Sequence, residues 1–346
     1  MPLTLQVDTD RWRDHLRAYV AAGTGIVPVT KGNGYGFGNP VLAAEAFDLG
    51  LDTLAVGTYE EVADVTRPFP GDVLVLSPWR PGLDMGLTRD SRIVHTVSRL
   101  TDLRELAEGD HRPRVVVEVL TSLRRHGIAA TEIGQAVALL DQVRFEGWAL
   151  HLPLAGDRLA QARGLSRLFV ATSASEGHRL WVSHLDSDDA ARLAIETAAD
   201  IRLRVGTALW LGERSAYRAR ASVLDLHAVR RGQPFGYRQR RASRDGVLLV
   251  VAGGTAHGIA LEAPTPATSL RQRAVSVATG GLEALGRALS PYYVAGKRRW
   301  FAEPPHMQCS LIWVPSSIDP PAVGDEIDVD VRFTTTTFDH TAWGLK

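Results

Sequence analysis

Short apolar runs alternate with helix-like segments through the first two thirds of the chain. Eight of these runs read as strands, at residues 26–30, 53–57, 72–77, 93–98, 114–120, 147–153, 179–186 and 201–206. Several are almost wholly apolar, which is typical of strands buried on both faces of a parallel sheet. Between them, capped or periodic segments predict helices, for example at residues 40–49, 131–143 and 188–199. This alternation predicts a (β/α)8 barrel of the TIM type, with a doubly wound open sheet as the competing topology.

The pattern changes after Gly212. Further strand-like runs, separated by glycine, proline and polar turns, occur at residues 222–229, 246–251, 274–278, 310–314 and 326–333. A helical pattern is limited to residues 281–288. We therefore expect a barrel domain over residues 1–215, followed by a smaller, mainly β domain over residues 216–346.

Charge and cysteine content narrow the functional classes. The 346 residues include 39 basic and 39 acidic side chains, so the formal net charge is zero. A chain without a basic field is not expected to bind nucleic acid or a membrane surface. The single cysteine, Cys309, excludes an intrachain disulfide and a multi-thiolate metal site. Because there is neither a secretion leader nor an apolar run long enough to span a bilayer, we expect a cytoplasmic protein.

Only three of the basic residues are lysines, Lys31, Lys297 and Lys346. Lys31 directly follows the first barrel strand, and the glycines after it allow close approach of backbone. A lysine there could form a Schiff base with a carbonyl compound if burial and neighbouring arginines lower its pKa. From position alone, a phosphate-contacting or solvated lysine is the alternative. The segment is not a P-loop, because its glycines follow the lysine.

In a barrel, catalytic side chains gather at the carboxyl ends of the strands. Besides Lys31, those ends here carry Glu118, Arg125, His151, Asp186, Ser187, Arg204, Gly206 and Thr207. A metal-dependent hydrolase using His151, His184 and Asp186 is one alternative. It lacks a His-x-His at the end of the first strand, and its three residues crowd onto two adjacent strands. We therefore expect no metal.

Four segments between residues 31 and 237 together resemble the alanine racemase family, in that family's order. Residues 31–38 read KGNGYGFG where the family has KANAYGHG, and residues 121–128 read TSLRRHGI where it has TGMGRLGI. Residues 204–210 read RVGTALW where the family has RPGIALY. Residues 232–237 read GQPFGY and resemble the start of its GExVSYG segment.

The resemblance implies a pyridoxal-phosphate barrel followed by a β domain, and a homodimer with shared active sites. The implied activity is racemisation of a small amino acid, most simply L-alanine to D-alanine, with D-alanine feeding cell-wall peptide. Lys31 would hold the cofactor and act as base on one face of the substrate Cα. Tyr237, from the second subunit of a head-to-tail dimer, would be the base on the other face. Racemisation needs both, because one face loses the proton and the other regains it.

The remaining implied roles concern the cofactor. Arg204 would face the pyridine nitrogen and keep it unprotonated, because guanidinium does not readily give up a proton. The other contacts would be Tyr35, Ser187 and the amides of Gly206 and Thr207 at the phosphate, Arg125 at the phenolic oxygen, and His151 against the ring. Without the resemblance, His151 is interpreted equally well as a core histidine, and Tyr237 is better interpreted as a tyrosine that caps a β turn.

Glu118 lies seven residues before Arg125, where many family members carry a carbamylated lysine. A glutamate could supply the same negative charge permanently, so we hypothesise that Glu118 orients Arg125. A strand-end glutamate in solvent is the alternative.

The C-terminal half departs from the family pattern. Residues 254–258 read GTAHG where the family has GYADG, and residues 306–308 read HMQ in place of MDQ. By the resemblance, Met307 would lie near the substrate. These changes imply an altered substrate-facing wall, whereas the cofactor-binding residues are retained. The alternatives are a racemase of another amino acid, such as serine, and a catalytically inactive pyridoxal-phosphate-binding protein.

Overall fold

The computed structural model describes residues 2–172, 179–261 and 288–344. The chain divides into two compact units. The barrel unit is Arg13–Gly212, and the β unit combines Met1–Trp12 with Glu213–Lys346. The expected barrel domain over 1–215 therefore needs a correction, since the first twelve residues belong to the β unit.

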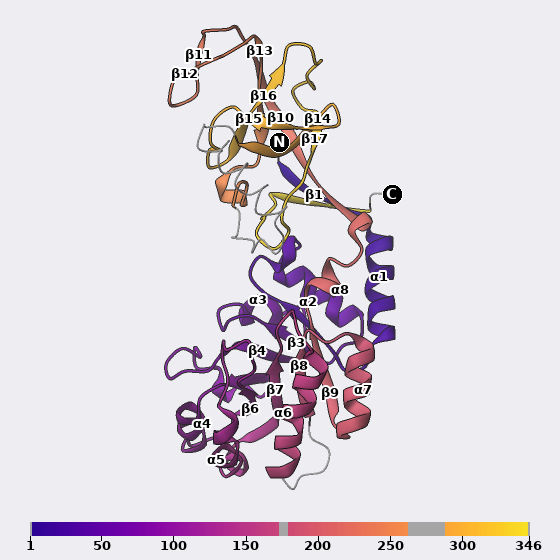
Figure 1. Cartoon of the computed structure of the whole chain (residues 1–346), viewed down its shortest axis with the longest axis vertical. Coiled ribbons are helices and arrows are strands. Elements are labelled where there is room, and N and C mark those ends of the chain that lie inside the picture. Colours follow the sequence, from indigo (N-terminus) through magenta and orange to yellow (C-terminus); the bar gives the residue numbers. More distant parts are fainter. Residues whose placement is uncertain (1, 173–178, 262–287, 345–346) are drawn as a thin grey trace. The chain divides into compact units, whose positions relative to one another are not determined.

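The barrel unit is built on a closed ring of eight parallel strands (Figure 1). These are β2 (Ile26–Thr30), β3 (Thr53–Val56), β4 (Asp72–Pro78), β5 (Ile93–Val97), β6 (Arg114–Val119), β7 (Arg144–His151), β8 (Arg179–Ser183) and β9 (Asp200–Val205). Pairing of β2 with β9, as at Ile26 and Leu203, closes the ring. The expected TIM-type barrel is confirmed, and the open doubly wound sheet is excluded.

Helices follow each of the barrel strands except β4 (Figure 1). They are α2 (Asn39–Asp48), α3 (Val62–Thr66), α4 (Leu100–Ala107), α5 (Ile133–Val137), α6 (Arg158–Thr172), α7 (Ser187–Thr197) and α8 (Thr207–Trp210). Helix α1 (Thr9–Ala22) precedes β2. The helix expected over 131–143 is interrupted, because α5 is flanked by the 3-10 turns Ala130–Glu132 and Leu140–Gln142.

The inside of the barrel is filled by apolar side chains from its strands. One buried cluster is Val27, Val29, Ala55, Leu74, Val94, Val116, Ala149 and Trp181. All five residues of β2 and all five of β5 are buried, as expected for strands covered on both faces. This packing holds the strand ends, and the side chains they carry, in fixed positions.

The β unit contains an eight-stranded sheet in the order β13-β16-β15-β14-β17-β10-β1-β18, with a further pairing between β13 and β10. Its strands are β1 (Leu3–Val7), β10 (Tyr217–Val229), β13 (Gly246–Ala252), β14 (Leu289–Val294), β15 (Lys297–Phe301), β16 (Cys309–Pro315), β17 (Glu326–Val329) and β18 (His340–Trp343). β11 (Pro234–Phe235) and β12 (Arg240–Arg241) form a separate two-stranded hairpin.

Strand β1 explains why the first residues belong to this unit. It pairs antiparallel with β10, as at Leu3 and Ala221, and parallel with β18, as at Thr4 and His340. The expected strand at 274–278, and all but the last residue of the expected helix at 281–288, lie outside the described residues. In the part of the chain that is described, no helix has the length and apolarity needed to cross a membrane.

Candidate active site

Lys31 directly follows β2, and its loop is fastened by a carboxylate that sequence reasoning missed. Glu61 accepts hydrogen bonds from the backbone N–H of Gly32 at 2.6 Å, of Gly57 at 2.7 Å and of Thr58 at 3.2 Å. A Cβ on Gly57 would lie 3.0 Å from the Lys31 Cβ, so glycine keeps the two strand ends close. The only signal in the sequence is the glycine that ends the second barrel strand, four residues before Glu61.

The protein around Lys31 destabilises its charged form, although the side chain is exposed at the end of its strand. Loss of hydration lowers the pKa of Lys31 most, followed by the positive charge of Arg125. Glu61 acts in the opposite direction, and Arg204 lowers the pKa further. An amine with a lowered pKa is uncharged, and therefore nucleophilic and basic, in a larger fraction of molecules at neutral pH.

Tyr35 reaches from the Lys31 loop to the end of β9. Its backbone is left-handed (φ 54°), and its side chain is buried. The Tyr35 hydroxyl lies only 2.0 Å from where a Cβ on Gly206 would stand, and it hydrogen-bonds the Thr207 side chain. Burial, and then Glu61, raise the pKa of Tyr35 to about 12. Three of the residues expected at a phosphate are thus brought together at the start of α8.

Arg204 and Glu118 are buried charged residues that lie within electrostatic reach of each other. Their exposed fractions are 4% and 3%. Arg204 Nη2 donates to the Leu150 carbonyl at 2.9 Å, while Arg204 Nε and Glu118 Oε2 have no hydrogen-bond partner among the described residues. Burial lowers the pKa of Arg204 to about 10 against the attraction of Glu118. Buried polar groups are normally satisfied, so these two atoms indicate a place for a further polar group.

Arg125 lies in the loop after β6 and is exposed. Its charge acts on Lys31, Glu118 and Arg204, which places it in the same cluster. Burial raises the pKa of Glu118, and the charges of Arg204 and Arg125 counteract this. The alternative of a solvated strand-end glutamate is excluded, because Glu118 is buried.

His151 ends β7 and contacts a second histidine at the same end of the barrel. Its ring centroid lies 4.9 Å from that of His184, in an edge-to-face arrangement. His184 Nδ1 donates to the Leu152 carbonyl at 2.7 Å, and its backbone is left-handed (φ 65°). Burial and Arg204 lower the pKa of His151 to about 3, so the ring is neutral at physiological pH. From the sequence, His184 is a candidate only in the metal-dependent hydrolase alternative.

Ser187 has a different neighbour from those expected. It is the first residue of α7, whose N-terminus is capped by Asp186 accepting from the Asp189 N–H at 2.8 Å. Ser187 Oγ lies 3.5 Å from where a Cβ on Gly23 would stand, just after α1. A phosphate contact of Ser187 therefore stays a prediction.

Tyr237 and Met307 belong to the β unit. Tyr237 lies between β11 and β12, and its side chain is 84% exposed. Together with Arg238, His306 and Met307 it lines a pocket of about 630 Å³. The two residues expected at the substrate from this half of the chain therefore share one open cavity.

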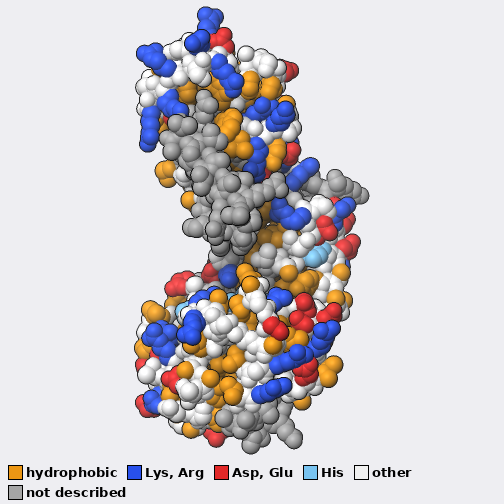
Figure 2. Space-filling view, in the orientation of Figure 1, with side chains coloured by type: hydrophobic (Ala, Val, Ile, Leu, Met, Phe, Trp, Pro, Cys, Tyr) orange, Lys and Arg blue, Asp and Glu red, His pale blue; other side chains and the backbone are white. Residues whose placement is uncertain are grey.

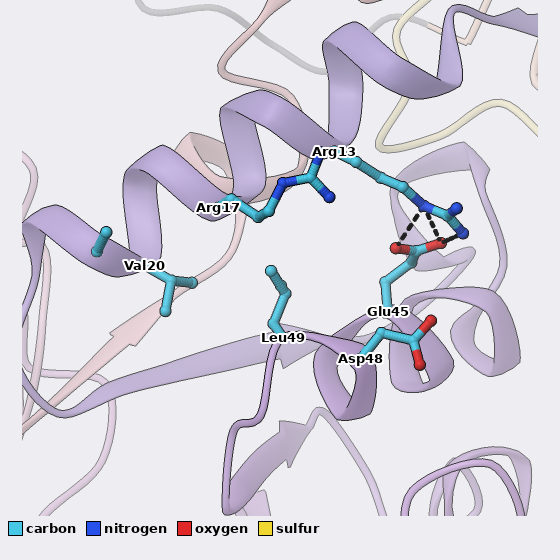
Figure 3. A pocket seen from close by; sticks show the side chains of 7 residues that line it. Arg13, Arg17, Val20, Glu45, Asp48 and Leu49 are labelled. Carbon is cyan, nitrogen blue, oxygen red and sulfur yellow. Dashed lines mark hydrogen bonds and ion pairs between the residues drawn. The ribbon is translucent and has the colours of Figure 1, made fainter.

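Another pocket, of about 390 Å³, lies between α1 and α2 in the barrel unit (Figure 3). There Arg13 Nε donates to both carboxylate oxygens of Glu45 at 3.0 Å, and the two side chains point toward each other. This ion pair joins two outer helices, and we assign the pocket no chemistry. No cluster of three or more metal-ligating side chains is found within residues 2–172, 179–261 and 288–344.

The chain is similar to known proteins over most of its length. Residues 7–214 match the family model described as alanine racemase, N-terminal domain. An alanine racemase of Sorangium cellulosum is 28% identical over 290 residues, covering 75% of this chain and 76% of that protein. One from Mycobacterium tuberculosis is 28% identical over 266 residues, covering 68% and 67%.

Solved structures share the fold. An alanine racemase from Bartonella henselae with covalently bound pyridoxal phosphate superposes with a TM-score of 0.74, at 14% identity over 99% of both chains. That of Streptomyces lavendulae gives 0.69 at 20% identity, over 99% of this chain and 97% of that one. At these identities the likeness establishes the architecture of both units.

Proposed function

The chain belongs to the alanine racemase family, and from this premise we propose that it is a pyridoxal-phosphate-dependent racemase that interconverts L- and D-alanine. The observation that carries the proposal is the setting of Lys31. It is an accessible amine of lowered pKa, and the charges of Arg125 and Arg204 act on it. Arginine at this position would keep the charge but not the chemistry, because guanidinium is neither deprotonated nor nucleophilic.

The residues around Lys31 fit pyridoxal phosphate. The unpartnered Nε of buried Arg204 is a donor for the ring nitrogen, and Gly206 leaves the space that a Cβ would fill beside the Tyr35 hydroxyl. When bound, the cofactor withdraws electrons from the amino acid's Cα and makes its proton removable. The residues that would hold it are Lys31 at the carbonyl carbon, Arg204 at the ring nitrogen, Tyr35, Ser187, Gly206 and Thr207 at the phosphate, Arg125 at the phenolic oxygen and His151 against the ring.

Two side chains would exchange the Cα proton, one on each face of the substrate. Lys31 Nζ accepts or donates on one face, helped by its lowered pKa. Tyr237 Oη does so on the opposite face, and Met307 lines the same cavity beside it. His151 stays neutral, because its pKa is about 3, and it adds no charge to the site.

Tyr237 would act in the active site of a second copy, within a head-to-tail homodimer. The charges of the two units favour contact between the barrel unit of one copy and the β unit of another. The barrel unit has 21 basic and 25 acidic residues, whereas the β unit has 18 and 14. Residues 230–244, which carry Tyr237, include six arginines and no acidic residue. Lys and Arg side chains are frequent over the visible face of the β unit in Figure 2. Complementary charge of this kind speeds and orients association.

Glu118 would act through the two arginines that its charge reaches. Its carboxylate is the negative group that opposes the lowering of the Arg204 pKa by burial, and it also interacts electrostatically with Arg125. We expect it to keep both guanidinium groups oriented toward the cofactor, without any modification of a lysine.

The test begins with protein purified in the presence of pyridoxal phosphate. We expect a visible absorbance from bound cofactor, which Lys31→Ala abolishes, and deuterium incorporation from D₂O at Cα of both enantiomers of alanine. A protein that binds no cofactor would contradict the proposal. Bound cofactor without Cα exchange would indicate a binding protein instead. Faster exchange with serine or a larger amino acid would change the proposed substrate but not the proposed reaction.

A further inference from the structure

A buried carboxylate lies directly against the turn that carries Tyr237. Glu303 is 3% exposed and follows β15. One of its oxygens, Oε2, accepts from the Tyr237 backbone N–H at 2.9 Å. The other, Oε1, lies 2.7 Å from His306 Nε2. A single buried acid therefore joins the backbone of Tyr237 to a neighbouring imidazole.

The turn is shaped to meet this carboxylate. Gly236 has a left-handed backbone (φ 69°), and a Cβ there would come within 2.2 Å of Glu303 Oε2. Only glycine lets the backbone approach so closely. From the hairpin itself, Gln239 Nε2 donates to the Gly236 carbonyl at 2.9 Å. The peptide immediately before Tyr237 is therefore held by two side chains.

His306 extends the contact from the backbone of Tyr237 to its ring. The two ring centroids lie 4.5 Å apart. Because the partner of Nε2 is a buried carboxylate, Nε2 carries the proton and donates it. The other ring nitrogen, Nδ1, lies 3.8 Å from Cys309 Sγ. The orientation of the imidazole is thus set by Glu303, and the imidazole in turn gives the exposed tyrosine ring one fixed neighbour.

We propose that Glu303 and His306 are positioning residues for Tyr237, holding its phenol at the one place where it can exchange the Cα proton. The inference rests on the proposed function, since it assumes that Tyr237 is one of the two bases. Tyr237 is largely exposed and lies on a hairpin of two-residue strands, so little else restrains it. A misplacement of about 1 Å in a reacting group can cost about 100-fold in rate.

The experiment measures exchange of the Cα hydrogen with D₂O, separately from each enantiomer of alanine, in the cofactor-loaded enzyme. Tyr237→Phe first identifies the enantiomer whose hydrogen faces Tyr237. In Glu303→Gln and in His306→Ala we expect that same enantiomer to exchange roughly 10- to 100-fold more slowly. The other enantiomer, which depends on Lys31, keeps its rate within about twofold, and KM changes little. Glu326→Gln, which alters an exposed carboxylate on β17, serves as the matched control and leaves both rates unchanged.

The two enantiomers distinguish positioning from general damage. Equal slowing of both enantiomers, or wild-type rates for both, would overturn the inference and leave the proposed function standing. Retention of the Lys31-dependent rate shows that a variant is folded and loaded. If the wild-type holoenzyme exchanges neither enantiomer, the proposed function fails, and this inference fails with it.

Discussion

The site residues expected in the two units differ in how far they are buried and in what holds them. In the barrel unit, Arg204 and Glu118 lie on strands packed on both faces, and their side chains are almost fully buried. In the β unit, Tyr237 lies on a short hairpin and is 84% exposed. The barrel groups gain their electrostatic effects from loss of hydration, whereas the hairpin tyrosine depends on Glu303 and His306 for its position.

This difference in burial determines how sensitive each group should be to its neighbours. A buried charge interacts strongly over several ångströms, because little water screens it. In the barrel unit, one changed charge should therefore alter several pKa values at once. An exposed tyrosine feels such charges weakly, so only its placement can be disturbed. Substitutions that change a charge should therefore affect the site residues of the barrel unit most. Substitutions that shift the position of Tyr237 should be the ones that matter in the β unit.

The largest effect is expected at Lys31. Lys31→Arg keeps the positive charge but removes the nucleophile and base, so cofactor attachment is lost and activity falls by about 10²- to 10⁴-fold. The measurement is racemisation rate together with the mass of the borohydride-reduced protein. The control Lys297→Arg, on β15, keeps both properties. Wild-type activity in Lys31→Arg would mean that charge alone suffices.

The next effect is expected at Glu118. Glu118→Gln removes the only negative charge that acts on both Arg204 and Arg125 in the described cluster. Removing a group that orients the residues in direct contact with a ligand costs about 10- to 100-fold in affinity at metal sites, so we expect the cofactor to bind roughly 10- to 100-fold more weakly. Titration of the cofactor by absorbance measures this. The exposed Glu105→Gln is the control, and unchanged affinity in Glu118→Gln would remove Glu118 from the site.

A smaller effect is expected at Glu61. Glu61→Gln weakens an acceptor of three backbone N–H groups that joins the Lys31 loop to the end of β3. The three donors are exposed or half-buried, and a hydrogen bond typically contributes about 0.5–1.5 kcal/mol, so we expect a modest loss of stability, seen mainly as a lower melting temperature. Turnover should fall less than in Glu118→Gln. If neither stability nor turnover changes, the loop is held by other contacts.

The smallest expected effect is on how the free energy of unfolding depends on pH. Burial raises the folded-state pKa of Glu118 above its ordinary value of 4.5. As pH rises, the unfolded chain releases this proton before the folded chain does. The free energy of unfolding therefore falls between pH 4.5 and the raised folded-state pKa, by about 1.4 kcal/mol for each pH unit between these two pKa values. In urea unfolding of cofactor-free protein at pH 4 and pH 7, the free energy of unfolding of Glu118→Gln should rise relative to that of the wild type at the higher pH. A constant difference would show that the pKa of Glu118 is not raised by folding.

The sequence predicted the barrel well because its signal is local. A strand buried on both faces is a continuous apolar run, and β2 was predicted to the residue over 26–30. Strand β1 was missed because its partner β10 lies about two hundred positions away, and five alternating residues carry no information about such a distant neighbour. For the same reason the first twelve residues were placed in the wrong unit.

The site could be predicted only where topology gathers it. Glu118 and Arg204 lie on strands of one closed barrel, so their proximity follows from the fold. Glu61 and Glu303 could not be predicted in this way. Each accepts backbone N–H groups from a neighbouring turn, and apart from the glycine four residues before Glu61 no pattern in the sequence marks an acid that does so.

The central claim is that each active site combines Lys31 of one chain with Tyr237 of another. The most direct test mixes Lys31→Ala and Tyr237→Phe chains after unfolding and joint refolding with cofactor. Random assortment makes half of the dimers mixed, and each mixed dimer has one intact site of two, so activity should return to about one quarter of the wild-type value. Activity no higher than the sum of the two separate variants would contradict the shared site.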